Sequence, residues 1–298
     1  VQGKVLTDEE VKEYYAKKQP YGEWLDSYLV QLKDIKIPNL PVEEYTKEER
    51  MRLQKAFGYT YEEYRSSIGK MALNGVEATA SMGIDTPLAV LSYEHQPLFN
   101  YFKQLFAQVT NPPIDCIREE IVTSTSVYVG RDGNLLEEEP KNCQVLKINN
   151  PILTNTDMLK IKNMKVEGFK AVTVPITYYK SAPLDRAMDR LFVEVDRAHR
   201  AGANILILSD RGVDENHVAI PSLLAVSAVH QHLVKTKKRT SLAIILESGE
   251  PREVHHFATL LGYGACAINP YLALDTIHEL IEEGMIKKDY YAAVEDYN

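Results

Sequence analysis

The sequence has 298 residues, of which 45% are hydrophobic and 26% are charged, and its formal net charge is −8. These proportions are typical of globular chains and exclude bulk disorder. The acidic balance argues against a general nucleic-acid-binding protein, which would carry a basic excess. No apolar run approaches the roughly 20 residues that span a bilayer, and the length suits one large domain or two smaller ones.

The first 80 residues carry helix signals. Two capping boxes, each a threonine followed three residues later by a glutamate, begin at Thr7 and Thr46 and predict the starts of two helices. A third helical pattern follows, and a proline-marked link separates the first two helices. We therefore interpret residues 1–80 as an N-terminal helical extension or linker, with helices over 8–18, 47–57 and 61–73.

The next stretch mixes loops with less regular patterns. Residues 82–87 read as a loop, and a short apolar run follows over 88–92. An amphipathic helix is predicted over 97–108, ended by Pro112 and Pro113, because proline disfavours helix in the residue before it. Residues 117–130 combine helix and strand signals, and we assign them to a helix.

From about residue 140, strand-like and helix-like segments alternate. Alternation of this kind predicts parallel strands joined by right-handed crossovers. Several strands are continuous apolar runs, which suits a sheet covered on both faces. The pattern predicts a doubly wound sheet or a (β/α) barrel, complete or incomplete. The expected strands are 145–148, 171–174, 205–208, 242–246 and 265–268, and the expected helices are 156–163, 184–201, 221–235, 252–261 and 271–284.

Polar residues follow the predicted strands, at the edge where parallel α/β folds carry their chemistry. One hypothesis makes Glu247 or Asp210 a general acid or base, with Arg211 or Lys180 holding an anion. The alternative makes them turn residues, helix caps and ion pairs. No known catalytic motif has this spacing, so we favour the alternative.

The spacing of the histidines, glycines and cysteines matches no metal-binding or phosphate-binding motif. The pairs His255–His256 and His230–His232 are spaced so that their side chains point apart on a helix. The glycines at 262 and 264 precede a strand, whereas a dinucleotide-binding loop follows one. The three cysteines, Cys116, Cys143 and Cys266, lack metal-ligand spacing. We expect free thiols, a reducing compartment and a cytoplasmic location.

Long contiguous motifs resemble a known family. They are Ser81–Ser92 (SMGIDTPLAVLS), Tyr101–Asp115 (YFKQLFAQVTNPPID) and Glu247–Phe257 (ESGEPREVHHF), with Pro20–Leu25 and Ala267–Leu272 in support. Together they resemble the central domain of the glutamate synthase large subunit. The resemblance covers essentially the whole chain, and the absence of an initiator methionine before Val1 fits an expectation that the chain is part of a longer polypeptide.

The resemblance implies a fold and a role. In that family, a glutaminase domain releases ammonia from glutamine, and a synthase domain with FMN and an iron–sulfur cluster makes glutamate from ammonia and 2-oxoglutarate. The central domain connects them, is a degenerate relative of the FMN barrel, and carries no catalytic residue. We therefore expect an α/β domain over 81–298 that resembles an incomplete or degenerate TIM barrel, forming one compact unit with the N-terminal extension.

The resemblance also implies partners and contact residues. The expected partners are the glutaminase and FMN synthase domains of the same polypeptide, with no nucleic acid or membrane, no cofactor or metal in this chain, and no activity of the isolated chain. Thr110 and Asn111 are expected to face the ammonia route, and Met82 to approach the FMN domain. In the alternative, Asn111 only begins the proline turn. Two further alternatives are a free-standing (β/α) enzyme and a module with a vestigial flavin or phosphate site.

Overall fold

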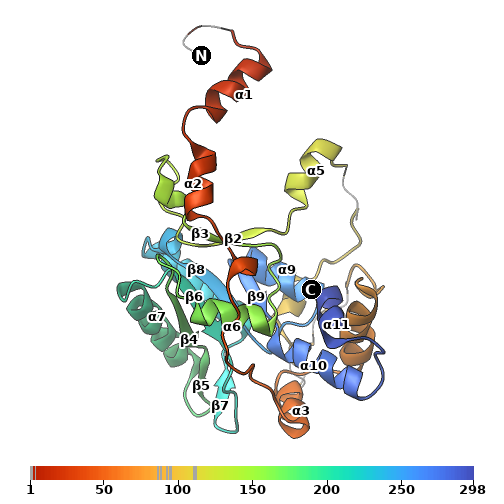
Figure 1. Ribbon diagram of the computed structural model, residues 1–298. Coiled ribbons are helices and arrows are strands. Elements are labelled where there is room, and N and C mark those ends of the chain that lie inside the picture. Colours follow the sequence, from red (N-terminus) through yellow and green to blue (C-terminus); the bar gives the residue numbers. More distant parts are fainter. Residues whose placement is uncertain are drawn as a thin grey trace.

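The computed structural model describes residues 3, 5–85, 87, 89–91, 93, 96–109 and 113–298. At the centre of these residues lies a four-stranded parallel sheet in the order β4-β6-β8-β9 (Figure 1). In its register, Leu208 lies opposite Val174 on one side and Leu246 on the other. The four strands confirm four of the predicted ones: β4 (Ala171–Pro175), β6 (Ile205–Ser209), β8 (Ala243–Glu247) and β9 (Ala267–Asn269).

Both faces of this sheet are buried, as the continuous apolar strands predict. Alternate residues of β6, such as Leu206 and Ile207, point to opposite faces and belong to two separate cores. One face is covered by helices α7 to α10, and the other by helix α6 and a second, smaller sheet. The helices are α6 (Asn155–Asn163), α7 (Leu184–Arg200), α8 (Ser222–Lys235), α9 (Val254–Gly262) and α10 (Tyr271–Glu282).

Helix α7 illustrates why the helix predictions succeeded here. Its buried residues Ala187, Leu191, Val195 and Ala198 recur every three or four positions, which places them on one face of a helix. The glycine after the helix, Gly202, has a φ of +83°. This left-handed conformation is the usual end of a helix and costs glycine little.

The smaller sheet corrects one prediction. Its order is β1-β3-β2, with β1 parallel and β2 antiparallel to β3. Residues 117–130 are therefore not one helix, because helix α5 (Cys116–Val122) ends early and β2 follows. The valines and the tyrosine of β2 have high strand propensity, and pairing with β3 realises it. The strands are β1 (Val30–Gln31), β2 (Val127–Gly130) and β3 (Val145–Ile148).

The chain after β3 touches the far edge of the central sheet. Ile152 forms an isolated parallel bridge with Ile268 of β9. Between β3 and β4 the described residues show no strand pairing, so they form no closed barrel. The structure confirms the α/β class with mostly parallel strands. A short antiparallel hairpin, β5 (Thr177–Tyr179) with β7 (His217–Ala219), follows β4 and β6.

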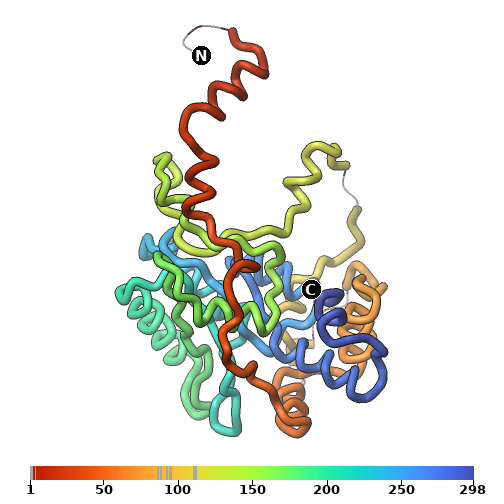
Figure 2. Tube along the Cα trace, viewed as in Figure 1, coloured from red at the N-terminus to blue at the C-terminus, as the bar shows by residue number. Residues whose placement is uncertain are grey.

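The N-terminal part is helical, as predicted, and both capping boxes are present at Thr7 and Thr46. Figure 2 traces this part from the projecting N-terminal helices along the body to α3. The third predicted helix begins with a π-helical turn at Glu63–Ile68 and continues as α4, which packs against α11. The helices are α1 (Asp8–Ala16), α2 (Tyr21–Tyr28), α3 (Lys47–Ala56), α4 (Gly69–Asn74) and α11 (Tyr290–Tyr297).

The predicted helix over 97–108 is wrong. Only a short 3-10 helix forms, at Leu98–Phe102. The residues after it run beside the loop at 81–85, where the amide of Ile84 donates to the carbonyl of Gln104 at 2.9 Å. A Cβ at Gly83 would lie 2.6 Å from Phe106 Cα, so the glycine permits this close approach. Within the described residues, no helix is both long and apolar enough to cross a membrane.

Candidate functional site

A buried charged cluster lies at the carboxyl ends of β6 and β8, where the sequence predicts a functional edge. At its centre is Glu247, with 2% of its surface exposed. Lys162 Nζ, from α6, lies 2.7 and 2.8 Å from the two carboxylate oxygens. Arg211 Nε donates to Oε1 at 2.9 Å, and Ser209 Oγ donates to Oε2 at 2.6 Å. Both oxygens are therefore engaged by protein donors.

The partners of Glu247 determine its charge. Burial alone would raise the pKa of its carboxyl, because a low-dielectric surrounding disfavours the ion. The positive charge of Arg211 and the hydrogen bond from Lys162 outweigh this and hold the pKa below its ordinary value. A carboxylate that is ionised, saturated with donors and closed to solvent forms a structural ion pair and is unsuited to proton transfer.

Asp210 joins the loops that follow β6 and β8. The amide of Gly249 donates to its Oδ1 at 3.1 Å, and Ser248 Oγ donates to its Oδ2. The side chain is 1% exposed, and burial raises the pKa of its carboxyl to about 7. Asp210 is thus titratable near neutral pH, but its oxygens face the protein's own backbone and serine.

The chain before α4 covers this cluster. Arg211 Nη1 donates to Tyr45 Oη at 2.9 Å. The Arg211 guanidinium also lies 4.0 Å from the centre of the ring of Tyr271, the first residue of α10. Glu43 lies 3.4 Å from Arg211 Nη1. We call residues 43–63, which pack over this edge of the sheet, the N-terminal strap.

A second arginine anchors the other half of the N-terminal strap. Arg252 is 1% exposed and donates to the carbonyls of Phe57 and Gly58 at 3.2 and 3.0 Å. Its Nη2 also lies 3.0 Å from Glu63, and its guanidinium lies 4.4 Å from the centre of the Tyr59 ring. The N-terminal strap and the two arginines therefore close the edge at which a parallel α/β fold would receive a substrate.

The sequence located this edge only in part. Asp210, Arg211 and Glu247 lie together, as predicted. Lys180 does not join them, because its backbone pairs with Asn216 in the β5–β7 hairpin region. Sequence analysis missed Lys162 and Arg252. Arg252 had a usable signal, since it is a charged residue in the loop that directly follows a buried strand.

The four histidines that the sequence analysis weighed each contact other residues of the protein. His255 Nε2 lies 2.9 Å from the carbonyl of Phe99, and the His256 ring stacks on the Phe99 ring with centroids 4.3 Å apart. His232 pairs with Asp196 at 3.1 Å, whereas His230 lies beside Arg239. No group of three or more potential metal ligands occurs in the part of the chain that the structure describes.

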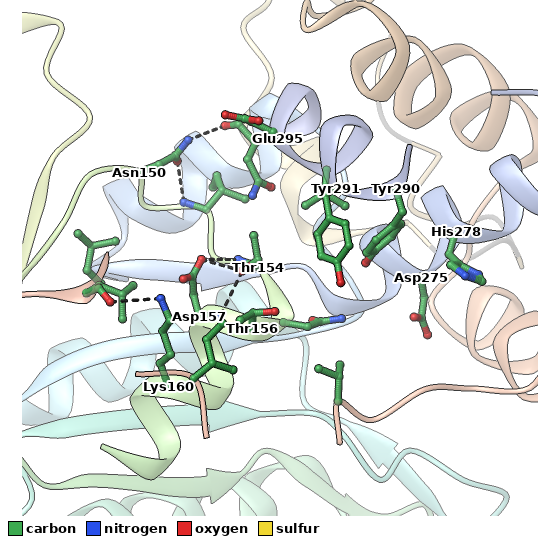
Figure 3. A pocket seen from close by; sticks show the side chains of 18 of the residues that line it. Asn150, Thr154, Thr156, Asp157, Lys160, Asp275, His278, Tyr290, Tyr291 and Glu295 are labelled. Atoms are coloured by element: carbon green, nitrogen blue, oxygen red, sulfur yellow. Dashed lines mark hydrogen bonds between the residues drawn. The ribbon is translucent and has the colours of Figure 1, made fainter. Parts of the chain in front are cut away.

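A separate cleft of about 1150 Å³ lies beside this edge (Figure 3). The chain around 31–45, the start of α6, and helices α10 and α11 form its walls. Figure 3 shows Lys160 on one side of the cleft and Asp275, His278, Tyr290 and Tyr291 on the other. Sequence analysis did not identify this cleft, although Asp275 is a lone carboxylate within the apolar start of α10.

The residues expected at interdomain contacts are described only in part. Met82 is 39% exposed. Its carbonyl accepts from Gln104 Nε2 at 3.2 Å, and its sulfur lies 3.1 Å from the amide of Gln108. The loop of Met82 is therefore held against the segment that leads to Thr110. Thr110 and Asn111 lie outside the described residues.

The same segment and α5 expose large apolar side chains. Figure 1 shows α5 projecting from the body of the structure, at the same end as α1 and α2. Ile117 and Ile121, one helical turn apart on α5, are 83% and 80% exposed. We use the name apolar arm for the exposed side chains of Leu105, Phe106, Val109, Ile117, Ile121 and Val122.

Comparison with known proteins gives one family. The model of the family described as glutamate synthase central domain matches residues 52–297. Among curated proteins, the chain is 45% identical over 300 residues to the glutamate synthase [NADPH] large chain of Bacillus subtilis. That match covers 99% of this chain and 19% of the relative.

Two other relatives give the same result. The chain is 39% identical over 299 residues to glutamate synthase [NADH] of Saccharomyces cerevisiae, covering 96% of this chain and 14% of that protein. It is 40% identical over 281 residues to the chloroplastic ferredoxin-dependent glutamate synthase of Oryza sativa, and that match covers 93% of this chain and 17% of the relative. The chain thus spans a fifth or less of the length of these relatives.

Proposed function

This chain belongs to the glutamate synthase central domain family, and we propose that it is a non-catalytic domain that holds two catalytic domains of one polypeptide in position. The relatives are glutamate synthases five or more times as long as the match, so most of each relative lies outside the region that this chain resembles. The proposed partners are a glutaminase domain and an FMN-containing synthase domain of the same polypeptide.

The closed sheet edge is the observation that carries the non-catalytic role. Glu247, Asp210 and Arg211 occupy the positions where chemistry would be expected, yet each is engaged by the protein itself. Of the cations at this edge, Lys162 and Arg211 both bind Glu247, and Arg252 binds Glu63. The edge is therefore not built to hold a flavin phosphate, and we place FMN and the iron–sulfur cluster in another domain.

The apolar arm supports a role in contact with other domains. Monomeric proteins rarely expose contiguous apolar patches larger than a few hundred Å², and patches above that size mark interaction surfaces. Ile117 and Ile121 lie one turn apart on α5, and Leu105, Phe106 and Val109 expose further large apolar side chains in the preceding part of the chain. We place a neighbouring domain of the same polypeptide against this arm.

We also propose that the loop around Met82 and the residues Thr110 and Asn111 border the route of ammonia. Passage of a small neutral molecule requires a narrow wall that excludes water and needs no proton donor. Met82 fits such a wall, because its carbonyl accepts from Gln104 Nε2 and its sulfur lies against the amide of Gln108. Its thioether then contributes apolar surface.

The proposed fold is an incomplete (β/α) barrel. The bridge between Ile152 and Ile268 supports it, because it continues the row of parallel strands by one member. We propose one compact unit in which 1–80 is an extension of the domain at 81–298. Buried Ile68, Met71 and Ala72 support this unity, since they lie in the main core with residues of the second part.

The ammonia route can be tested in the intact glutamate synthase polypeptide that carries this chain. Replacing Asn111→Trp should narrow or misdirect the route, so that glutamine is still hydrolysed while ammonia escapes into solution. Glutamate formed per glutamine consumed should then fall. Asp189→Trp, on the exposed side of α7, is the matched control and should leave the ratio unchanged. Full coupling in the Asn111 variant would count against the route.

A further inference from the structure

One buried carboxylate in the cleft has no partner. Asp275, on α10, is 8% exposed, and its Oδ2 is buried without a hydrogen-bond partner among the described residues. Buried polar groups in native proteins are almost always hydrogen-bonded, and an unpaired buried carboxylate is costly. Asp275 lines the cleft and points into it (Figure 3). A donor that enters from the cleft would supply a partner for this carboxylate.

The surroundings of Asp275 suit a cation. Glu44 of the N-terminal strap lines the same cleft and is close enough to raise the pKa of the Asp275 carboxyl, whereas Glu295 lies apart from it, near Asn150 (Figure 3). Tyr290 and Tyr291, from α11, and His278, from α10, add aromatic surface, and aromatic rings attract organic cations through their faces.

The protein's own cations near Asp275 do not pair with it, although Nε and Nη1 of Arg50 are buried without a hydrogen-bond partner among the described residues. Arg50 Nη1 lies 3.5 Å from Glu282, and its Nη2 donates to the carbonyl of Tyr45 at 3.4 Å. Arg211 binds Glu247. Neither guanidinium lies within ion-pair distance of Asp275, although Arg50 is close enough to influence the ionisation of this carboxyl.

The other side of the cleft has the opposite charge. Lys33, Lys147 and Lys160 line it beside the first turn of α6. Among the described residues, none of the three forms an ion pair with a carboxylate, and Lys160 Nζ reaches only the carbonyl of Leu32 at 3.4 Å. A ligand with a cation at one end and an anion at the other would satisfy both sides.

We propose that the cleft binds a basic amino acid, with its side-chain guanidinium or ammonium at Asp275 and its carboxylate toward the lysines. The volume of about 1150 Å³ accommodates such a molecule, since small-molecule sites span roughly 300–1,000 Å³. An arginine or lysine side chain of a polypeptide offers the same cation without the free carboxylate. The proposal stands independently of the role in glutamate synthase, because it concerns binding to this chain.

The ionisation of Asp275 gives a second signature. Burial raises the pKa of its carboxyl to about 6, while Arg50, Arg211 and His278 lower it and Glu44 raises it. Tyr290 also lies close to it, because Asp275 contributes to the raised pKa of that tyrosine. A cation binds the ionised carboxylate, so affinity should rise between pH 5 and pH 7.

The test is calorimetric titration of the 298-residue chain with L-arginine and with L-citrulline, which has a neutral group of similar shape. Arginine should bind at least about tenfold more tightly, the value of a charge-assisted hydrogen bond. Asp275→Asn should abolish this preference, whereas Asp189→Asn, on exposed α7, should keep it. Equal binding of both ligands, absence of arginine binding into the millimolar range, or an unchanged preference in Asp275→Asn would overturn the proposal.

A second variant and a peptide ligand complete the experiment. If Asp275→Asn does not fold, Glu44→Gln on the exposed N-terminal strap should still weaken arginine binding a few-fold, and no change there would count against the site. The blocked peptide acetyl-Gly-Arg-Gly-amide lacks the free carboxylate. Weaker binding of this peptide than of free arginine supports the amino acid as ligand. Equal or tighter binding would overturn that assignment and leave a polypeptide side chain in its place.

Discussion

Glu247 stands where parallel α/β folds carry catalytic acids, yet its oxygens are bonded to Lys162, Arg211 and Ser209. Burying such an ion cluster costs desolvation energy, and the attraction between its charges offsets this cost only while every partner is present. Removing the negative charge leaves a buried arginine and a partly exposed lysine facing each other. The cluster therefore contributes chiefly to holding α6 and the loops after β6 and β8 in place.

The variant Glu247→Gln tests this structural role. It keeps the side chain's shape but removes its charge, and we expect the free energy of unfolding to fall by about 3–5 kcal/mol, the range for removing one partner of a buried ion pair. Urea denaturation measures it. The control Glu194→Gln breaks the exposed pair with Arg197 and should cost less than about 1 kcal/mol. Equal, small losses in both variants would contradict the structural role.

Asp210 predicts a pH dependence of stability. Its folded pKa of about 7 exceeds the ordinary value of 3.8, so the folded state binds more protons than the unfolded state between these values. Stability must then fall as pH rises from about 4 to about 7, and level off above that. Asp275 contributes in the same direction up to about pH 6. In urea titrations, Asp210→Asn should therefore lose much of the decline between pH 4 and pH 7, and an unchanged decline would contradict the assignment.

Individual residues were only partly predictable from the sequence. The polar positions after the strands identified Asp210, Arg211 and Glu247, because strand ends follow from hydrophobic pattern. Their bonds depend on Lys162, which precedes Glu247 by 85 positions, and no local pattern relates the two. The unpaired state of Asp275 likewise depends on where Arg50 and Tyr290 come to lie.

At the scale of elements, the N-terminal strap controls access to the sheet edge, and Arg252 is its main anchor. Arg252→Ala leaves the carbonyls of Phe57 and Gly58 without their donor and removes the ion pair with Glu63. We expect a loss of about 3 kcal/mol or more in unfolding free energy and preferential proteolysis within 43–63. Arg186→Ala, on exposed α7, should change neither. Cleavage of the Arg252 variant outside 43–63 at the same rate as within it would contradict the anchoring role.

Helices and strands with a clear hydrophobic pattern were predictable from the sequence. Elements that form only by pairing with residues far along the chain were not. The helix at 184–200 and the apolar strands follow from their own residues. Strand β2 depends on pairing with β3, so its segment was assigned to a helix. Residues 103–108 have an amphipathic pattern, yet they leave the helix to run beside the loop at 81–85. β1 has only two residues and carries no detectable signal.

At the scale of the whole molecule, the structure combines a closed sheet edge with an exposed apolar arm. The first argues against catalysis at the expected edge, and the second argues for contact with another domain. The family assignment and the short span relative to the curated relatives agree with both. We therefore propose that this domain works by binding neighbouring domains and holding them in position.

Hydrogen exchange of α5 and of residues 103–109 tests that claim most directly. The measurement compares the isolated 298-residue chain with the longer polypeptide that we propose carries it. We expect these amides to exchange rapidly in the isolated chain, because the side chains of Ile117 and Ile121 are 83% and 80% exposed. In the longer polypeptide they should be protected at least about tenfold, an opening cost of about 1.4 kcal/mol or more. The buried strands β6 and β8 should exchange equally slowly in both. Equal exchange of the apolar arm in the two proteins would contradict the account.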